Sequence, residues 1–116
     1  MNKFNKVNIK EEARTELHDL LALTGAEISI NVLPAGAGVP FVHSHRQNEE
    51  IYAILEGEGK AVIDGENVSL KAGDWLRVSP SAKRQFFASD EKSLKYVCIQ
   101  VKADSLEGYT MTDAIV

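Results

Sequence analysis

The fold of this chain is decided by residues 43–57, which read HSHRQNEEIYAILEG. His43 and His45 lie two positions apart, so on an extended segment both side chains point to the same face. Glu50 begins the apolar run that follows, and we predict a strand over residues 50–55. If the three side chains face the interior of a closed sheet, two imidazoles and one carboxylate converge there. Such a trio binds Fe(II), Mn(II), Ni(II) or Zn(II) and leaves coordination positions open for a substrate or water.

The sequence around this stretch alternates short apolar runs with turn residues, which is typical of an all-β domain. The pair Asp64-Gly65 between two such runs signals a hairpin, because both turn residues tolerate positive φ. We predict chain breaks at residues 57–59 and 71–74. The pattern favours a sandwich or closed barrel over a parallel α/β sheet. The expected strands cover residues 27–33, 39–45, 50–55, 60–63, 67–70, 75–78, 84–88 and 94–101.

Both ends of the chain differ from this β-rich core of residues 26–101. In residues 1–25, apolar side chains recur at helical spacing, which predicts a short helix from about residue 11 to 18; residues 18–23 would alternatively serve as a strand. The tail from residue 102 to 116 is less regular and suits an edge strand or a contact with a partner subunit. At 116 residues we expect one domain covering the whole chain.

Composition and charge exclude several classes of function. The formal charge is −4 and no basic stripe is present, so nucleic acid is not an expected partner. The apolar runs are too short to cross a bilayer, and the first residues lack the apolar core of a secretory signal. Cys98 has no second cysteine to bridge with, and we interpret it as a small buried side chain rather than a reactive thiol. We therefore expect a cytoplasmic location.

Residues His43, His45, Glu50 and Gly57 together resemble the first motif of the cupin superfamily, in which His-x-His, a spacer, Glu, six residues and Gly follow one another. The resemblance extends over about residues 26–101. It implies a jelly-roll β-barrel with a divalent transition metal (Zn, Mn, Fe or Ni) held by the two histidines and the glutamate. It also implies a small-molecule ligand, and the class includes dioxygenases, isomerases and decarboxylases as well as non-catalytic sugar or anion binders.

The second cupin motif is degenerate. Arg84 stands where the family's pattern places a fourth, histidine ligand, and Ala88 stands at the usual asparagine. Three interpretations of Arg84 remain open. It binds an anionic substrate with two parallel hydrogen bonds, it replaces the metal as a fixed positive charge, or it reaches solvent from a strand end. Without a metal, His43 and His45 would form a polar pocket with Glu50 paired to Arg84.

Other positions are secondary candidates. Tyr52 shares the face of Glu50 and is predicted either to contact a ligand or to be a core tyrosine, and Gln47 is predicted to support the ligands from the intervening loop. Trp75 and the pair Phe86-Phe87 are expected to fill the barrel or a subunit interface. The opposite face of the 50–55 strand is also apolar, through Ile51, Ala53 and Leu55. A strand apolar on both faces must be covered on both, which predicts a homodimer.

Two functions follow from the sequence. The first is a metal-dependent enzyme acting on a small polar or anionic molecule through two histidines and one carboxylate. The second is a binding module that senses or carries a small anion or sugar without chemistry. The retained trio favours the first, and the missing fourth ligand favours the second.

Overall fold

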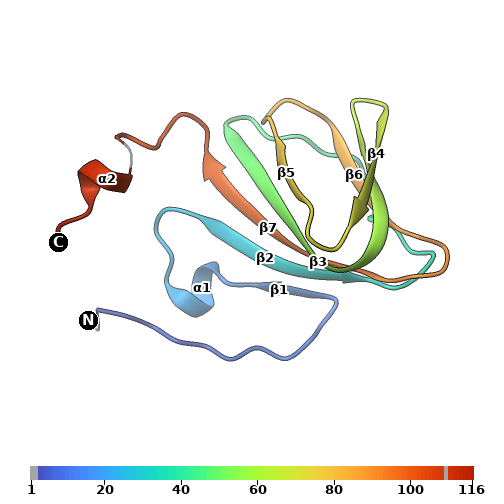
Figure 1. Cartoon of the computed structure of the whole chain (residues 1–116), viewed down its shortest axis with the longest axis horizontal. Helices are drawn as coiled ribbons and strands as arrows, with labels where there is room; N and C mark the ends of the chain where they lie inside the picture. The colour runs from blue at the N-terminus through green and yellow to red at the C-terminus, as the bar shows by residue number, and fades with distance from the viewer. Residues whose placement is uncertain (1–2, 109) are drawn as a thin grey trace.

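The computed structural model describes residues 3–108 and 110–116, and it shows two antiparallel sheets folded into a barrel (Figure 1). The predicted all-β barrel is confirmed. Two short helices lie outside it. In chain order the elements are β1 (Arg14–Glu16), α1 (His18–Leu21), β2 (Glu27–Leu33), β3 (Asn48–Ile63), β4 (Glu66–Lys71), β5 (Trp75–Val78), β6 (Arg84–Ala88), β7 (Leu94–Lys102) and α2 (Thr110–Asp113).

The long strand β3 belongs to both sheets. Its first half pairs with β7 and β5, which gives the order β1-β2-β7-β3-β5 in the sheet that we call sheet A. Its second half lies between β4 and β6 in sheet B. The strand passes from one sheet to the other next to an irregularity in the register between Ile54 and Glu56. β3 therefore links the two walls of the barrel.

Gly57 makes this transition possible. The predicted break over residues 57–59 was wrong, because the strand continues through it. Gly57 has φ of +87°, and a Cβ at this position would lie 1.7 Å from the carbonyl oxygen of Ser93. Only glycine tolerates both the positive φ and the close approach of β7. The residue that was expected to end a strand instead lets the strand change sheets.

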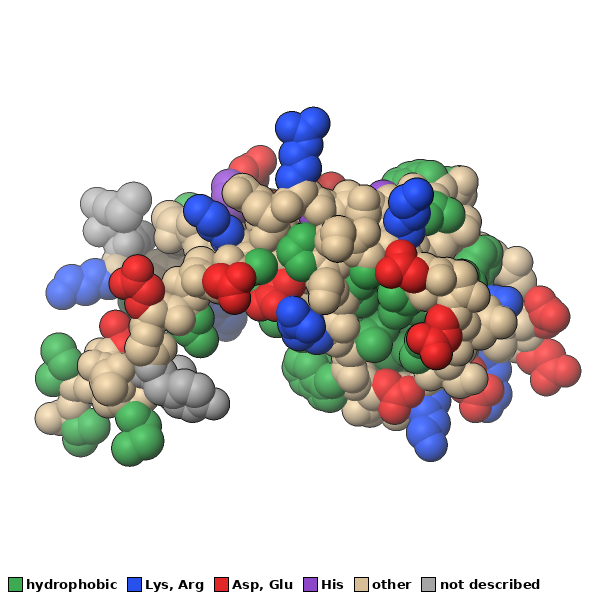
Figure 2. Space-filling model, turned by 90° about the horizontal axis from the view of Figure 1, so that it is seen from above, with side chains coloured by type: hydrophobic (Ala, Val, Ile, Leu, Met, Phe, Trp, Pro, Cys, Tyr) green, Lys and Arg blue, Asp and Glu red, His purple; other side chains and the backbone are tan. Residues whose placement is uncertain are grey.

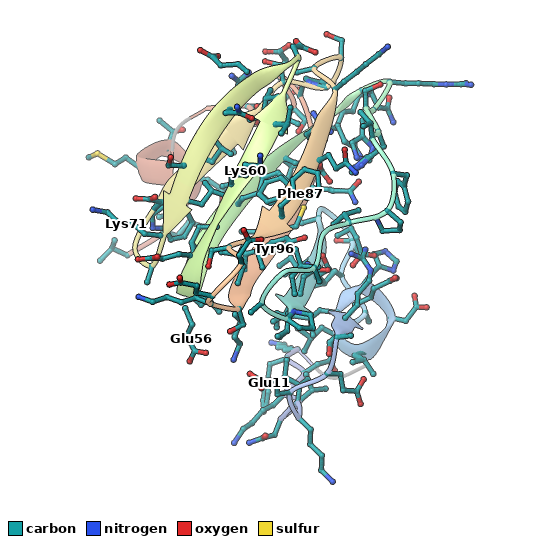
Figure 3. All side chains as sticks on the ribbon, turned by 90° about the vertical axis from the view of Figure 1, so that its right-hand side faces the viewer. Glu11, Glu56, Lys60, Lys71, Phe87 and Tyr96 are labelled. Carbon is teal, nitrogen blue, oxygen red and sulfur yellow. The ribbon has the colours of Figure 1, made fainter. Side chains whose placement is uncertain are left out.

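The core lies between the two sheets. The rings of Tyr52, Phe86 and Tyr96 pack on one another, with centroids 4.3 Å apart for Tyr52 and Phe86 and 5.0 Å apart for Phe86 and Tyr96. Phe86 thus fills the barrel as expected. Phe87 points to the outside of sheet B, where the ammonium of Lys60 lies 5.5 Å from its ring centroid (Figure 3). Trp75 does not fill the barrel, since it is 70% exposed on β5.

The outer surface of sheet A is apolar across several strands. One cross-strand row contains Ile28, Ile99 and Ile51 and ends on the charged Arg77, and the next contains Ile30, Val97, Ala53 and Trp75. We call these two rows the outer apolar face. Apolar residues therefore occupy both faces of the strand that contains Glu50, as the sequence indicates.

The N-terminal segment differs from the expectation. The helix predicted over residues 11–18 was wrong, because residues 14–16 form β1 and the helix covers only His18–Leu21. The amide of Val32 donates to the carbonyl of Ala13, and the amide of Leu17 donates to the carbonyl of Ile28. Pairing with the edge of β2 satisfies these backbone groups, and it outweighs a weak local preference for helix.

Two further segments bear on the predictions. Residues 39–45, expected as a strand, form a single isolated bridge, between His43 and Arg84. The C-terminal tail with α2 extends away from the barrel (Figure 1). Figure 2 shows hydrophobic side chains on the projecting end of the molecule, and the tail residues Leu106 and Met111 are largely exposed. Within the described residues, no helix is long and apolar enough to cross a membrane.

Candidate metal centre

Backbone hydrogen bonds hold the segment with the two histidines against the barrel. His43 and Arg84 exchange backbone hydrogen bonds of 3.2 and 3.0 Å, and the amide of His45 donates to the carbonyl of Pro80 over 2.7 Å. Glu50 lies on β3, where it is paired with Val78 on one side and Gln100 on the other. A paired strand and a pinned loop therefore fix the backbone of all three predicted ligands.

The structure brings the three side chains together. His43 Nε2 lies 3.6 Å from Glu50 Oε1, and His45 Nε2 lies 3.2 Å from Glu50 Oε2. The candidate ligand atoms all lie within 4.8 Å of one another. The imidazole rings stand nearly perpendicular, at 87°, with centroids 5.0 Å apart. This is the convergence of two imidazoles and one carboxylate that a transition metal requires.

Glu50 is the centre of a buried hydrogen-bond network. Its carboxylate accepts hydrogen bonds from the hydroxyl of Tyr52, from Nη1 of Arg84 at 3.0 Å and from the thiol of Cys98 at 3.2 Å. Burial raises the pKa of Glu50. The hydrogen bonds from Tyr52 and Cys98 and the charges of His45 and Arg84 outweigh that effect and bring the pKa below its usual value. Glu50 is therefore held as a carboxylate.

Arg84 is fully buried, with 0% exposure, so the interpretation that it reaches solvent was wrong. Its Nη1 contacts Glu50, and its Nη2 donates to the carbonyl of Ser79 over 2.5 Å. Its Nε is buried without a hydrogen-bond partner among the described residues. The neighbouring Lys83 is exposed, in line with strand alternation. The guanidinium thus lies beside the trio and neutralises Glu50.

The donor set itself fits a divalent transition metal. His45 Nε2 is buried, makes no hydrogen bond to the described residues and lies 3.2 Å from the Glu50 carboxylate, so a metal ion bound by both side chains would satisfy an atom that otherwise carries a free-energy penalty. Burial lowers the pKa of His43, which favours the neutral imidazole that a metal ligand needs. The nearby Arg84 charge opposes a cation, so the residues present would hold a metal with three protein ligands and a reduced affinity.

The trio opens into a cavity of about 500 Å³ inside the barrel. Tyr52 and Arg84 line this cavity, as the sequence suggests. Gln47 does not: its side chain is exposed, and its backbone carbonyl accepts a hydrogen bond from the amide of Ala103. Tyr52 donates its hydroxyl to Glu50 and packs on the core rings, so it orients the carboxylate.

Cys98 also lines the cavity and is buried. Burial raises the pKa of its thiol, and the adjacent Glu50 charge raises it further. A thiol in these surroundings stays protonated and is a poor nucleophile. The interpretation of Cys98 as a small buried side chain agrees with this environment, and the thiol adds one hydrogen bond to Glu50.

Sequence reasoning missed five polar residues of the cavity wall. They are Arg14 on β1, Ser29 and Asn31 on β2, Gln85 on β6 and Gln100 on β7. The signal that could have found two of them is the alternation in β2. There the polar residues Ser29 and Asn31 are buried, at 3% and 7% exposure, while Ile28 and Ile30 lie on the outer apolar face. Arg14 lay in the segment predicted as helix and carried no such signal.

A closed β-barrel with two histidines and a buried glutamate converging in its cavity defines the class of small cupin-like barrels. The family model "Cupin domain" matches residues 29–100 of the chain, and the chain therefore belongs to the cupin family.

Solved structures and curated proteins agree with this. A cupin protein from Bacteroides fragilis is 63% identical, with a TM-score of 0.97, over 100% of this chain and 98% of that one. A predicted oxalate decarboxylase from Thermotoga maritima is 28% identical, with a TM-score of 0.61, over 65% of this chain and 64% of that one. An uncharacterized protein from Methanocaldococcus jannaschii is 33% identical over 67 residues. That match spans 58% of this chain and about half, 53%, of the relative.

Proposed function

We propose that this protein is a metal-binding cupin that acts on a small polar or anionic molecule at His43, His45 and Glu50. The observation that carries the proposal is the convergence of the three ligand atoms at one wall of an open cavity. A metal held there with three protein ligands keeps coordination positions for a substrate. When bound, it would supply Lewis-acid polarisation of a substrate oxygen or a site for dioxygen.

Other residues of the cavity would position Glu50 and bind the ligand. Tyr52 and Cys98 donate hydrogen bonds to Glu50 and hold its carboxylate in place. Arg84 lines the cavity and shares its charge with Glu50, and its buried Nε is a donor without a hydrogen-bond partner among the described residues that suits an oxygen of an anionic group. A small carboxylate is the ligand class that these groups suit. The similarity to a predicted oxalate decarboxylase supports the same class.

A second function is supported by the ion pair of Arg84 and Glu50. Both side chains are buried, and the guanidinium already neutralises the carboxylate. In this alternative the cavity binds a small anion or sugar without a metal, and Arg84 takes the place of the cation. His43 and His45 would then serve as hydrogen-bonding groups of a polar pocket.

Metal analysis of protein purified without chelators separates the two. Under the first function, we expect close to one transition metal ion per chain in the wild type and its loss in His43→Ala and Glu50→Ala. His18→Ala is the matched control, because His18 is half exposed and lies outside the cavity. A wild type that is free of metal even after incubation with Zn(II), Mn(II), Fe(II) or Ni(II) contradicts the first function. Binding of an anion that depends on Arg84 in that same protein supports the second.

A further inference from the structure

We propose that Arg14 binds the ligand at a second point, away from His43, His45 and Glu50. One end of the ligand would lie at these three residues, and Arg14 would select ligands that carry a carboxylate at the other end. The inference rests on the proposed function for the trio end of the ligand, and it adds a specificity determinant from outside residues 29–100, the part that matches the cupin domain. It follows from a polar part of the cavity wall on β1 and β2, in the same sheet as Glu50 but two to three strands away from it.

The polar wall begins with two buried side chains on β2. Ser29 and Asn31 face the cavity and hydrogen-bond each other, with Asn31 Nδ2 donating to Ser29 Oγ over 3.0 Å. Burial of polar side chains destabilises a core unless every group is paired. An apolar pair would fill this position at a lower free-energy cost, so the polar pair needs another explanation. The contact made by Asn31 Oδ1 provides that explanation.

That oxygen accepts a hydrogen bond from Arg14. The two residues are direct partners in the pairing of β1 with β2, and Arg14 Nη1 lies 2.9 Å from Asn31 Oδ1. Glu16 accepts from Arg14 Nε at 3.2 Å. These two bonds fix the plane of the guanidinium, and Nη2 has no hydrogen-bond partner among the described residues. The chain Ser29–Asn31–Arg14 therefore holds a cation at the cavity with donors left over.

Tyr96 adds a neutral donor to the same wall. It is the register partner of Asn31 on β7, it is 5% exposed, and it lines the cavity. Figure 3 shows Tyr96 between the two sheets. Its hydroxyl makes no side-chain hydrogen bond to the described residues, and burial raises its pKa to about 12, so it stays protonated. A guanidinium with a hydroxyl nearby suits a carboxylate.

The sheet sets the separation between this wall and the trio. Following the register from Arg14 through Asn31 and Tyr96 leads to Ile54 on β3, four residues beyond Glu50. Three strand spacings amount to about 14 Å and four residues to about 13 Å along a flat sheet. The barrel curves and both side chains point inward, which shortens the gap. The two carboxylates of oxalate are directly bonded and cannot reach both ends, so only a dicarboxylate with several carbons between its carboxylates is a candidate.

Both the negative charge of Glu16 and exposure to solvent reduce the affinity of Arg14 for a carboxylate. Glu16 neutralises part of the Arg14 charge, and the Arg14 side chain is 51% exposed. The contribution of Arg14 is therefore smaller than that of a buried ion pair. A merely structural arginine would also hydrogen-bond Asn31. The experiment must consequently measure ligand selectivity, because stability alone does not distinguish the two roles.

Calorimetric titration of oxalate, adipate and hexanoate into metal-loaded protein tests the proposal. We expect the wild type to bind adipate more tightly than hexanoate, which has the same carbon count and one carboxylate. Arg14→Gln should weaken adipate roughly three- to tenfold and leave oxalate and hexanoate unchanged, since one partly exposed charged contact is lost. Arg14→Lys should restore part of the loss. Arg77→Gln is the matched control, because Arg77 also pairs with a glutamate, Glu49, but lies outside the cavity.

The proposal is overturned if adipate binds no better than hexanoate, if no adipate binding is measurable, or if Arg14→Gln and Arg77→Gln have the same effect. Metal content is measured on the same samples, which separates this result from the proposed function. A wild type without metal but with Arg14-dependent adipate binding refutes the metal centre alone. A fully metal-loaded Arg14→Gln variant with unchanged adipate affinity refutes the Arg14 site alone.

Discussion

Nη1 of Arg84 lies 3.0 Å from Oε1 of Glu50, and both side chains are almost entirely buried. This pair stands where the family's pattern places a fourth metal ligand beside the carboxylate ligand. The guanidinium supplies the positive charge that otherwise only a cation would bring to Glu50. The chemistry of the cavity therefore depends on whether the Glu50 carboxylate binds Arg84, a metal ion or both.

Removal of Arg84 should destabilise the protein strongly. In Arg84→Met, Glu50 keeps its burial and loses its charge partner, and we expect the free energy of unfolding to fall by about 3–5 kcal/mol. Arg77→Met is the control, because Arg77 is 62% exposed and its partner Glu49 is 24% exposed, so this pair should contribute less than about 1 kcal/mol. Urea denaturation at pH 7 measures both. Equal effects of the two substitutions would show that the buried pair has no special role.

Arg84→His should increase metal affinity. The substitution removes the competing positive charge and offers an imidazole from β6 next to the trio, which already has its ligand atoms within 4.8 Å of one another. We expect the dissociation constant for Zn(II) or Ni(II) to fall at least tenfold, measured by competition with a chromogenic chelator. Arg84→Gln separates the two causes, because it removes the charge without adding a ligand. An unchanged metal affinity in Arg84→His would contradict the interpretation that residue 84 occupies the position of the fourth metal ligand.

The metal-free protein should lose stability in two steps on acidification. The pKa of His43 is lowered from 6.5, so the unfolded chain binds more protons and stability falls as pH drops from about 6.5 through the folded pKa. The pKa of Glu50 is lowered from 4.5, so its contribution is present above that pH and is lost as pH falls through the folded pKa. Urea denaturation across this range is the measurement.

His18 provides a control of opposite sign. Its pKa is raised, chiefly by the hydrogen bond to Asp19, so its contribution is present below pH 6.5 and is lost as pH rises. His43→Asn should therefore flatten the upper step, whereas His18→Asn should steepen it. The same response in both variants would rule out this account of the upper step.

Gly57→Ala should be far more harmful than Gly65→Ala. Both glycines have positive φ, +87° and +81°, but only at Gly57 would the new Cβ meet a backbone atom, at 1.7 Å. We expect a loss of at least about 3 kcal/mol at Gly57 and about 1 kcal/mol at Gly65. Thermal or urea unfolding compares them. Similar losses would mean that the passage of β3 between the sheets does not depend on this contact.

Copies of the chain should associate through the outer apolar face. Trp75 is 70% exposed in the same cross-strand row as the half-buried Ile30 and Val97, and a second copy would remove these three side chains from water. We expect a dimer by sedimentation at micromolar concentration and a monomer for Trp75→Glu. Leu20→Glu, on α1 outside this face, is the control for adding a charge at an exposed apolar position. A wild type that sediments as a monomer would refute the prediction.

Local signals predicted much of the fold, and they predicted that His43, His45 and Glu50 converge. The alternation over residues 27–33 and the Asp64-Gly65 turn correspond to β2 and to the hairpin of β3 and β4. The two-residue spacing of His43 and His45 put both on one side, and the strand after them placed Glu50 nearby. These features depend on neighbours in sequence, for which periodicity and turn chemistry are sufficient.

Long-range packing decided the remainder. The sequence could not show that β1 would pair with β2 instead of forming a helix, because the partner carbonyls lie more than ten residues away. It left open whether Arg84 reaches solvent or Glu50, since alternation gives a face but not a contact. It also could not show that the polar face of β2 is the inner one. Burial depends on which sheet covers which face, so the cavity, the buried Arg84–Glu50 pair and the position of Arg14 at the cavity wall are properties of the tertiary structure.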